Sequence, residues 1–146
     1  MASSREFLTA YRIVAPRWVS TAFSGEGARR HGGRWNSPGR PVVYLAGSRA
    51  LAALELLLHL PSPRSRAKPY RILEARIPTR HIRDADRDAN PATVGDSWIR
   101  QERFLCLRAP SALIPEEPNY LLNPAHPEMA RVRVGEAVDF RFDDRL

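Results

Sequence analysis

Two glycines followed by an arginine and a tryptophan form a stretch whose residue types suggest chemistry. Gly32 and Gly33 carry no side chains, so the backbone there can approach a ligand closely. Arg34 follows them with a planar guanidinium group that matches the oxygens of a phosphate. A purely structural hairpin needs neither feature. We therefore predict an anion-binding turn at Arg34.

A single carboxylate interrupts a strongly apolar segment further along the chain. Glu55 lies between Ala52-Ala-Leu54 and Leu56-Leu-Leu58, which leave it no obvious polar face. A carboxylate in such surroundings must be paired, protonated or placed in a cavity. Two interpretations remain: Glu55 reaches water at the rim of the helix, or it lines a ligand cleft beside an arginine.

Two further side chains have both a structural and a functional interpretation. Tyr44 shares a face of its strand with Val42 and Ala46, where it either packs in the core or presents an aromatic surface beside Arg34. Ser111 follows Pro110 at the start of an apolar segment, where a hydroxyl is most often a strand-entry residue. Neither residue is informative alone.

Several common sites are excluded by spacing. No metal site is expected, because His31, His59, His81 and His126 match no zinc pattern and Cys106 is the only thiol. The chain has no phosphate-binding G-x-x-x-x-G-K-[ST] loop and no complete dinucleotide fingerprint. Cys106, flanked by Leu105 and Leu107, is expected to be an inert buried thiol.

The charge of the chain is unevenly distributed. Of 146 residues, the first 80 hold 14 basic and 4 acidic side chains, whereas the rest hold 9 and 12. All basic residues except Lys68 are arginines, which suits phosphate recognition and also fits a GC-rich genome. The basic half could bind an anionic small molecule, an acidic protein or nucleic acid, the last with Trp18, Trp35 and Tyr44 as stacking groups.

The location of the protein is predicted from what the sequence lacks. No apolar segment is long enough to span a bilayer, and residues 1–12 contain no apolar core of signal-peptide length. A lone cysteine cannot form an internal disulfide. We expect a cytoplasmic protein without membrane contact, whose 146 residues form one domain.

Apolar patterning and turn residues predict the elements that position these residues. Asn36–Gly39 is expected to be a turn before a strand over Pro41–Ala46, with Arg34 and Trp35 on the other arm of that hairpin. Ser48 is expected to cap a buried helix over Arg49–His59. The remaining expected elements are a loop over 61–69, a strand over Tyr70–Ile77, a helix over Asp96–Arg103, and strands over Phe104–Arg108, Ser111–Ile114 and Ala137–Phe142. Because strands outnumber helices and are often neighbours in sequence, we predict an α+β fold with mainly antiparallel sheets and flanking helices.

Taken in order, several short motifs resemble the RES domain family over almost the whole chain. The motifs are Tyr11-Arg12, Phe23–Gly27, Gly32–Asn36, Val43–Ala46, the Glu55 helix, Pro110-Ser111, Asn119–His126 and Phe142–Leu146. Each motif is weak, but the ordered combination is specific. The resemblance implies a single RES domain over residues 1–146 with a fold like that of ADP-ribosyltransferase toxins.

The resemblance also implies an activity. Members of this family are the toxins of bacterial toxin–antitoxin pairs, neutralised by a helix-turn-helix (Xre-like) antitoxin, so contact with nucleic acid is expected only through that partner. They destroy NAD⁺ by cleaving its nicotinamide–ribose bond, with water or inorganic phosphate as acceptor. NAD⁺ is the substrate, and no catalytic cofactor or metal is implied. Transfer of ADP-ribose to a protein is the alternative enzyme activity, and a basic nucleic-acid-binding module is the alternative from another class.

The residues for which the family is named look like Arg34, Glu55 and Ser111, although Arg12 is an alternative for the arginine. Further NAD⁺-binding residues implied by the resemblance are Arg12, Tyr44, Asn119 and Asn123. Arginines suit the pyrophosphate of NAD⁺, and Tyr44 suits the cationic nicotinamide ring. Glu55 suits stabilisation of an oxocarbenium-like ribose, and Ser111 would hold the nicotinamide–ribose end or a phosphate by hydrogen bonds.

Overall fold

A computed structural model describes residues 6–146, so residues 1–5 of the N-terminal segment considered above lie outside the described part of the chain. The described residues form one eight-stranded sheet with the strand order β4-β5-β6-β2-β1-β3-β7, in which β8 also pairs with β3. All pairs are antiparallel except β4 with β5. The sheet and its flanking helices confirm the predicted α+β class.

The strands are β1 (Phe7–Val14), β2 (Val43–Ala46), β3 (Tyr70–Pro78), β4 (Ile82–Asp84), β5 (Cys106–Pro110), β6 (Pro118–Leu122), β7 (Arg133–Val134) and β8 (Val138–Phe140). The helices are α1 (Glu26–His31), α2 (Arg49–Leu58), α3 (Pro63–Arg66) and α4 (Pro91–Gln101), with short 3₁₀ helices η1 (Pro16–Thr21), η2 (Thr79–His81) and η3 (Pro127–Arg131). None of the helices described here is long and apolar enough to cross a membrane.

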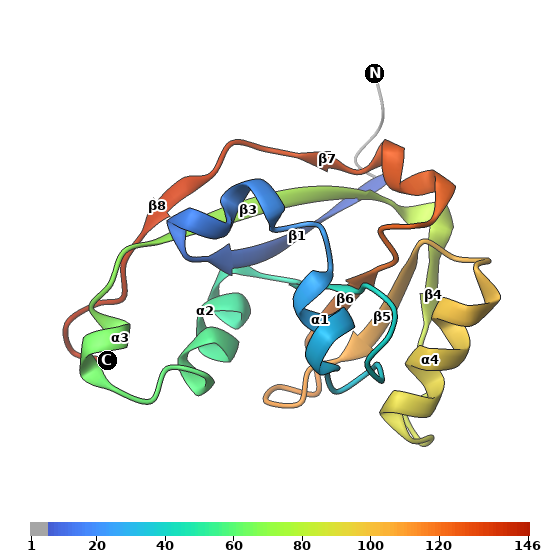
Figure 1. The fold of residues 1–146 in the computed structure, drawn as a ribbon, viewed down its shortest axis with the longest axis horizontal. Helices are drawn as coiled ribbons and strands as arrows, with labels where there is room; N and C mark the ends of the chain where they lie inside the picture. Colours follow the sequence, from blue (N-terminus) through green and yellow to red (C-terminus); the bar gives the residue numbers. More distant parts are fainter. Residues whose placement is uncertain (1–5) are drawn as a thin grey trace.

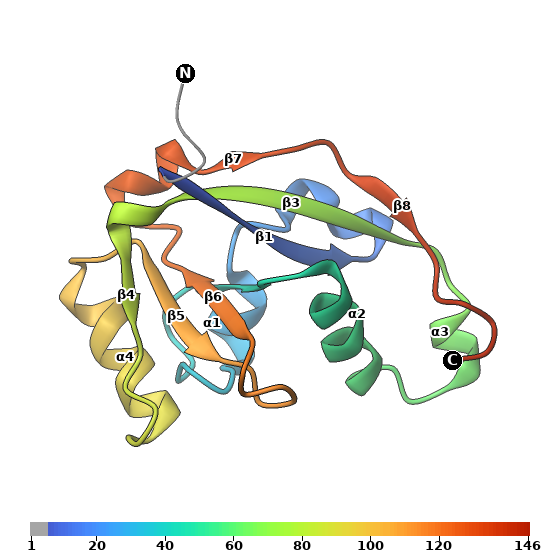
Figure 2. The ribbon, with the colours of Figure 1, turned by 180° about the vertical axis from the view of Figure 1, so that it is seen from behind.

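The sheet is strongly bent, and this bend creates the space for a site. The long strands β1 and β3 cross the top of the molecule, whereas β4, β5 and β6 run steeply away from them (Figure 1). Seen from behind, β7 and β8 follow the outer side of β3 (Figure 2). Helices α1 and α2 lie below the long strands, and α4 lies beside β4 (Figure 1).

Helix α2 begins where the sequence predicts, but it is less buried than expected. The Ser48 hydroxyl accepts a hydrogen bond from the Leu51 amide at 3.1 Å and caps the helix. Only Leu51 and Ala52 are buried, because one face of the helix packs against β1 and β2. Leu54 and Leu58 are 41% and 66% exposed. The expectation of a helix buried on nearly all sides is therefore wrong.

Arg34 and Trp35 occupy the tip of a turn rather than the arm of a hairpin. Gly33 and Asn36 form an isolated antiparallel bridge around them, with backbone hydrogen bonds of 2.9 and 3.3 Å. Gly32 ends α1 with a positive φ (+73°), which only glycine adopts readily, and a Cβ on Gly33 would lie 2.6 Å from the Tyr44 hydroxyl oxygen. The glycine pair therefore serves a helix end and a close backbone approach.

Three more predicted elements require correction. The expected loop over 61–69 contains the short helix α3, which Ser62 caps. The segment 111–114 is not a strand, because the Ser111 hydroxyl accepts the amides of Leu113 and Ile114 and holds the backbone in a turn. The helix expected over Asp96–Arg103 is α4, which begins earlier because Asn90 caps it and ends where Glu102 adopts a left-handed conformation. Strand β3 and the closing strand β8 confirm the predictions for those regions, with β8 shorter than expected.

Candidate functional site

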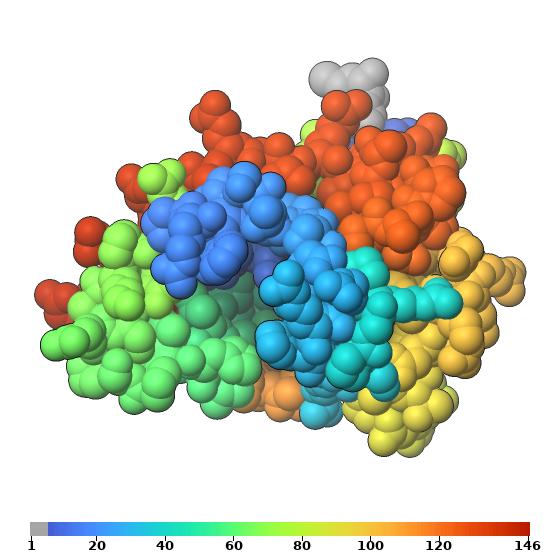
Figure 3. All heavy atoms as spheres, viewed as in Figure 1, coloured from blue at the N-terminus to red at the C-terminus, as the bar shows by residue number. Residues whose placement is uncertain are grey.

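A cavity of about 590 Å³ opens between α1 and α2. Its walls come from β1, β2, α1, α2, the Arg34 turn, the loop after β5 and Asn119 of β6. In the space-filling view it lies in the hollow between the green α2 region and the blue α1 region, below η1 (Figure 3). The cavity brings together residues that are more than 100 positions apart in sequence.

Glu55 lines this cavity and is held by two neutral hydrogen-bond donors. Its Oε2 accepts the Ser111 hydroxyl at 3.0 Å, and its Oε1 accepts the Asn119 side-chain amide at 2.9 Å. No ion pair of residues 6–146 includes Glu55. The carboxylate is therefore fixed in place without being neutralised by a cation.

The two donors are themselves fixed. Ser111 is 2% exposed, and its oxygen accepts the Leu113 and Ile114 amides at 3.1 and 3.3 Å, which leaves its proton for Glu55. The Asn119 side chain also donates to the Leu45 carbonyl at 3.3 Å. Such preorganisation means that Glu55 need not reorient when positive charge develops near it.

Arg12 brings a buried positive charge to the same cavity. Its Nη1 donates to the Tyr44 carbonyl at 3.0 Å, while its buried Nε has no hydrogen-bond partner in the described part of the chain. Burial lowers the pKa of the Arg12 guanidinium from its usual value. No carboxylate among the described residues pairs with it. A guanidinium with an unpaired donor and no counterion among residues 6–146 is well suited to an anionic ligand.

Arg34 lines the cavity from the Gly33–Asn36 turn, and its side chain is exposed. None of the ion pairs described for this chain engages Arg34 either. The cavity thus holds two arginines without acidic partners and one carboxylate without a basic partner. This arrangement can bind an anionic group at one part of a ligand and stabilise a cation at another.

Tyr44 connects β2 to the Arg34 turn through its hydroxyl group. The hydroxyl donates to Asn36 Oδ1 at 2.6 Å and accepts the Trp35 amide at 3.1 Å. Burial is the main reason why the pKa of Tyr44 is raised to about 12. The hydroxyl is thus occupied by the turn, and the ring is what Tyr44 offers to the cavity.

Comparison with known proteins matches the sequence model of the RES domain to residues 9–143. The chain belongs to the RES domain family. It is 33% identical over 149 residues to Toxin Res of Photorhabdus laumondii, with 93% of this chain and 95% of that protein covered. It is 36% identical over 138 residues to the Prs ADP-ribosylating toxin of a Sphingobium species, with 84% and 85% covered.

A solved structure has the same fold as this RES domain. A chain in the crystal structure of the M. tuberculosis MbcT–MbcA toxin–antitoxin complex superposes with a TM-score of 0.75. The aligned region covers 94% of this chain and 88% of that chain, at 19% sequence identity. The overall architecture is therefore shared although most residues differ.

Not all residues predicted for the site of this RES domain lie at the cavity. Arg12, Arg34, Tyr44, Glu55 and Asn119 line it. Ser111 lies behind Glu55 and reaches the cavity only through that carboxylate, so its expected contact with the nicotinamide–ribose end or a phosphate does not fit its position.

Asn123 is the second predicted residue that does not line the cavity. Its Oδ1 accepts the Ala125 amide at 3.0 Å, and its backbone bonds to Leu105 and His126. The side chain therefore stabilises the turn after β6, where an asparagine commonly bonds to the backbone two residues later.

Three residues were missed by reasoning from the sequence. Asn36 is 3% exposed and ties the Arg34 turn to Tyr44 and to the carbonyl of Ala28 at 3.0 Å. Tyr11 and His59 line the cavity. The position of His59, directly after α2 and four residues after Glu55, was a usable signal, because residues at this spacing share a helix face.

Proposed function

We propose that this RES domain cleaves the nicotinamide–ribose bond of NAD⁺. The observation that carries the proposal is the Glu55 carboxylate, held by Ser111 and Asn119 in a cavity that also presents Arg12 and Arg34. NAD⁺ has a pyrophosphate that suits the two guanidinium groups and a ribose that becomes cationic as nicotinamide leaves. The charges of the cavity therefore complement both the pyrophosphate and the reacting ribose of NAD⁺.

In the proposed reaction, the carbon–nitrogen bond breaks and its electron pair leaves with nicotinamide. The ribose develops oxocarbenium character, and Glu55 stabilises this charge more strongly than the charge of bound NAD⁺. Ser111 and Asn119 act as positioning residues for Glu55. Attack by water then yields ADP-ribose and a proton, whereas attack by inorganic phosphate yields a phosphorylated ADP-ribose.

The group that accepts the ADP-ribose distinguishes cleavage of NAD⁺ by water or phosphate from ADP-ribosylation of a protein. Transfer of ADP-ribose to a protein is the second candidate, favoured by the name of the Sphingobium relative, Prs ADP-ribosylating toxin. Both reactions use the same cavity and release nicotinamide. They differ only in the group that attacks the ribose.

Purified protein incubated with NAD⁺ labelled in its adenine ring tests these alternatives. The expected result is stoichiometric release of nicotinamide and a small-molecule product, whose mass shows whether water or phosphate was added. Label that remains on protein indicates transfer instead. If no nicotinamide is released in the presence of water, phosphate and a bacterial lysate, the proposed function is wrong.

We also propose that this chain is the toxin of a toxin–antitoxin pair, neutralised by a helix-turn-helix antitoxin. Two observations support this role: curated relatives are named Toxin Res, and the structural neighbour is a toxin–antitoxin complex. Expression in bacteria should arrest growth and deplete NAD⁺, and co-expression with the protein encoded beside it should prevent both effects. Normal growth at high expression of the active protein would contradict the role.

A further inference from the structure

Helix α4 contacts the Arg34 turn through two successive residues, Gly95 and Asp96. A Cβ placed on Gly95 would overlap the backbone carbonyl of Trp35, so the turn can pack this closely against α4 only if residue 95 is glycine. One residue later, Asp96 Oδ1 accepts the Ser37 amide at 2.8 Å, and its Oδ2 accepts the Ser37 hydroxyl at 2.6 Å. Two successive residues of α4 thus contact the backbone on both sides of Asn36.

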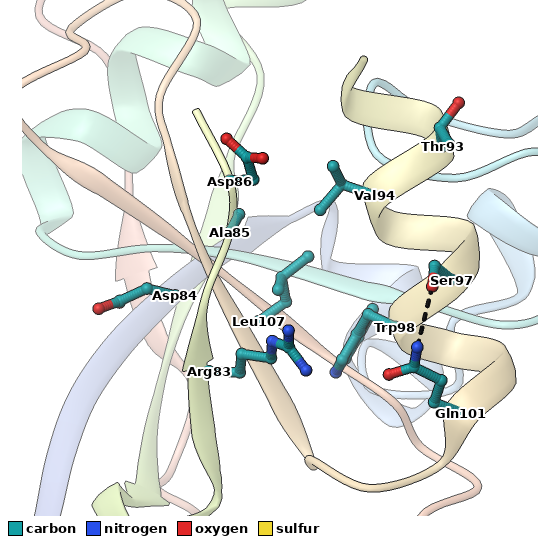
Figure 4. A pocket seen from close by; sticks show the side chains of 10 residues that line it. All are labelled: Arg83, Asp84, Ala85, Asp86, Thr93, Val94, Ser97, Trp98, Gln101 and Leu107. Carbon is teal, nitrogen blue, oxygen red and sulfur yellow. Dashed lines mark hydrogen bonds between the residues drawn. The ribbon is translucent and has the colours of Figure 1, made fainter. Parts of the chain in front are cut away.

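The helix itself is firmly seated. In Figure 4, Val94 and Trp98 point from α4 toward β4 and Leu107 across a cavity of about 380 Å³, and the indole of Trp98 donates to the Phe104 carbonyl at 2.9 Å. Trp98 is 4% exposed. Because α4 is fixed to the sheet, it can act as a rigid support for the turn.

Arg34 depends on this support more than the other residues of the cavity. Its side chain is exposed and enters no ion pair with the described residues, so only the backbone of the turn sets its position. The turn is held by the Tyr44–Asn36 hydrogen bond and, from α4, by the contacts of Gly95 and Asp96.

We infer that Gly95 and Asp96 are positioning residues that set the place of Arg34 in the cavity. The inference rests on the proposed function, in which Arg34 binds the pyrophosphate of NAD⁺. That contact exists in the bound substrate and in the transition state alike, so a displaced Arg34 weakens binding more than it slows the chemical step. A displacement of about 1 Å is enough to produce a large kinetic effect.

Replacement of Asp96 by alanine tests the inference. Asp96→Ala should raise the KM for NAD⁺ roughly 10-fold and change kcat by less than about 2-fold. Ser97→Ala is the matched control, because Ser97 is the next residue of α4 and its hydroxyl accepts only from Gln101, at 3.1 Å. Asp96→Asn retains an acceptor for the Ser37 amide and should recover most of the lost affinity.

A double variant separates positioning from general stability. If Asp96 acts through Arg34, Asp96→Ala should raise KM in the parent but add nothing in an Arg34→Ala background. An unchanged KM in Asp96→Ala, or an equal increase in both backgrounds, overturns the inference. A loss confined to the melting temperature, with KM unchanged at lower temperature, likewise indicates a merely structural residue.

The same variants remain informative if the parent does not cleave NAD⁺. In that case the proposed function fails, and titration calorimetry with inorganic pyrophosphate replaces the kinetic assay. A roughly 10-fold weaker binding in Asp96→Ala that disappears in the Arg34→Ala background upholds the positioning role. Equal affinity of Asp96→Ala and parent, or no binding by the parent, overturns it.

Discussion

Replacement of Glu55 by glutamine separates a catalytic carboxylate from a packing residue. The change keeps the length of the side chain and removes its charge. The amide oxygen can still accept the Asn119 amide, as Oε1 does now at 2.9 Å. The amide nitrogen then faces the Ser111 oxygen, whose acceptor positions already bind the Leu113 and Ile114 amides.

The expected effect on stability is small because two contributions oppose each other. Losing the Ser111 hydrogen bond to a charged acceptor costs about 1.5–3 kcal/mol, whereas removing a half-buried charge recovers part of that cost. We expect a net change in the free energy of unfolding of about 1 kcal/mol, which moves the melting temperature by roughly 4 °C. The expected effect on turnover is much larger, a loss of about 100-fold or more, because the preorganised charge is gone.

The assay follows nicotinamide release at saturating NAD⁺, with melting temperatures measured on the same samples. Glu116→Gln is the matched control, because Glu116 is exposed in the loop before β6 and makes no contact with the cavity. Near-normal turnover of Glu55→Gln would remove Glu55 from the mechanism. A loss of turnover that matches a loss of folded protein would make it a structural residue.

Other residues give equally direct tests. Ser111→Ala should lower kcat about 10-fold with little change in KM, because it loosens Glu55 without touching the substrate; a changed KM alone would contradict this role. Inorganic pyrophosphate should raise the melting temperature of the parent but not of Arg12→Met, whereas an equal rise in both would place the anion elsewhere. Burial raises the pKa of Cys106, so an aromatic disulfide reagent should not label the native protein at pH 8 and should label it fully in denaturant. The pKa of Tyr44 in the folded protein, about 12, exceeds the usual 10.0, so Tyr44 stabilises the fold below pH 10 and this stabilisation is lost as the pH rises toward 12. In Tyr44→Phe, the free energy of unfolding measured by denaturant titration should not fall in this way between pH 10 and 12.

The elements predicted correctly were those with strong local signals. Ser48 marked the start of α2, and the alternating apolar residues of 70–77 identified β3. Glu55, which lines the cavity, could be singled out because a carboxylate is conspicuous in an apolar helix. These features depend on propensity and periodicity within about ten residues, which a single sequence displays directly.

The features that could not be predicted depend on contacts between residues that are far apart in the sequence. The antiparallel register of β2 with β6 places Ala46 opposite Asn119, which brings the Asn119 amide to Glu55. No residue near Asn119 or Glu55 in the sequence indicates this contact. Ser111 looked like the start of a strand because its apolar followers suggested one, but its hydroxyl bonds to the backbone and makes a turn. The asparagine at 123 looked similar to the one at 119, yet it serves the turn after the strand.

The long sequence separation between Glu55 and its two donors also sets when the site can assemble during synthesis. Ser111 and Asn119 follow Glu55 by 56 and 64 positions. At roughly 5–20 residues per second, Asn119 is added about 3–13 s after the carboxylate it will hold. A nascent chain that has not yet reached β6 therefore lacks both an inner strand of the sheet and the donors that hold Glu55, so the site can form only after Asn119 has been added.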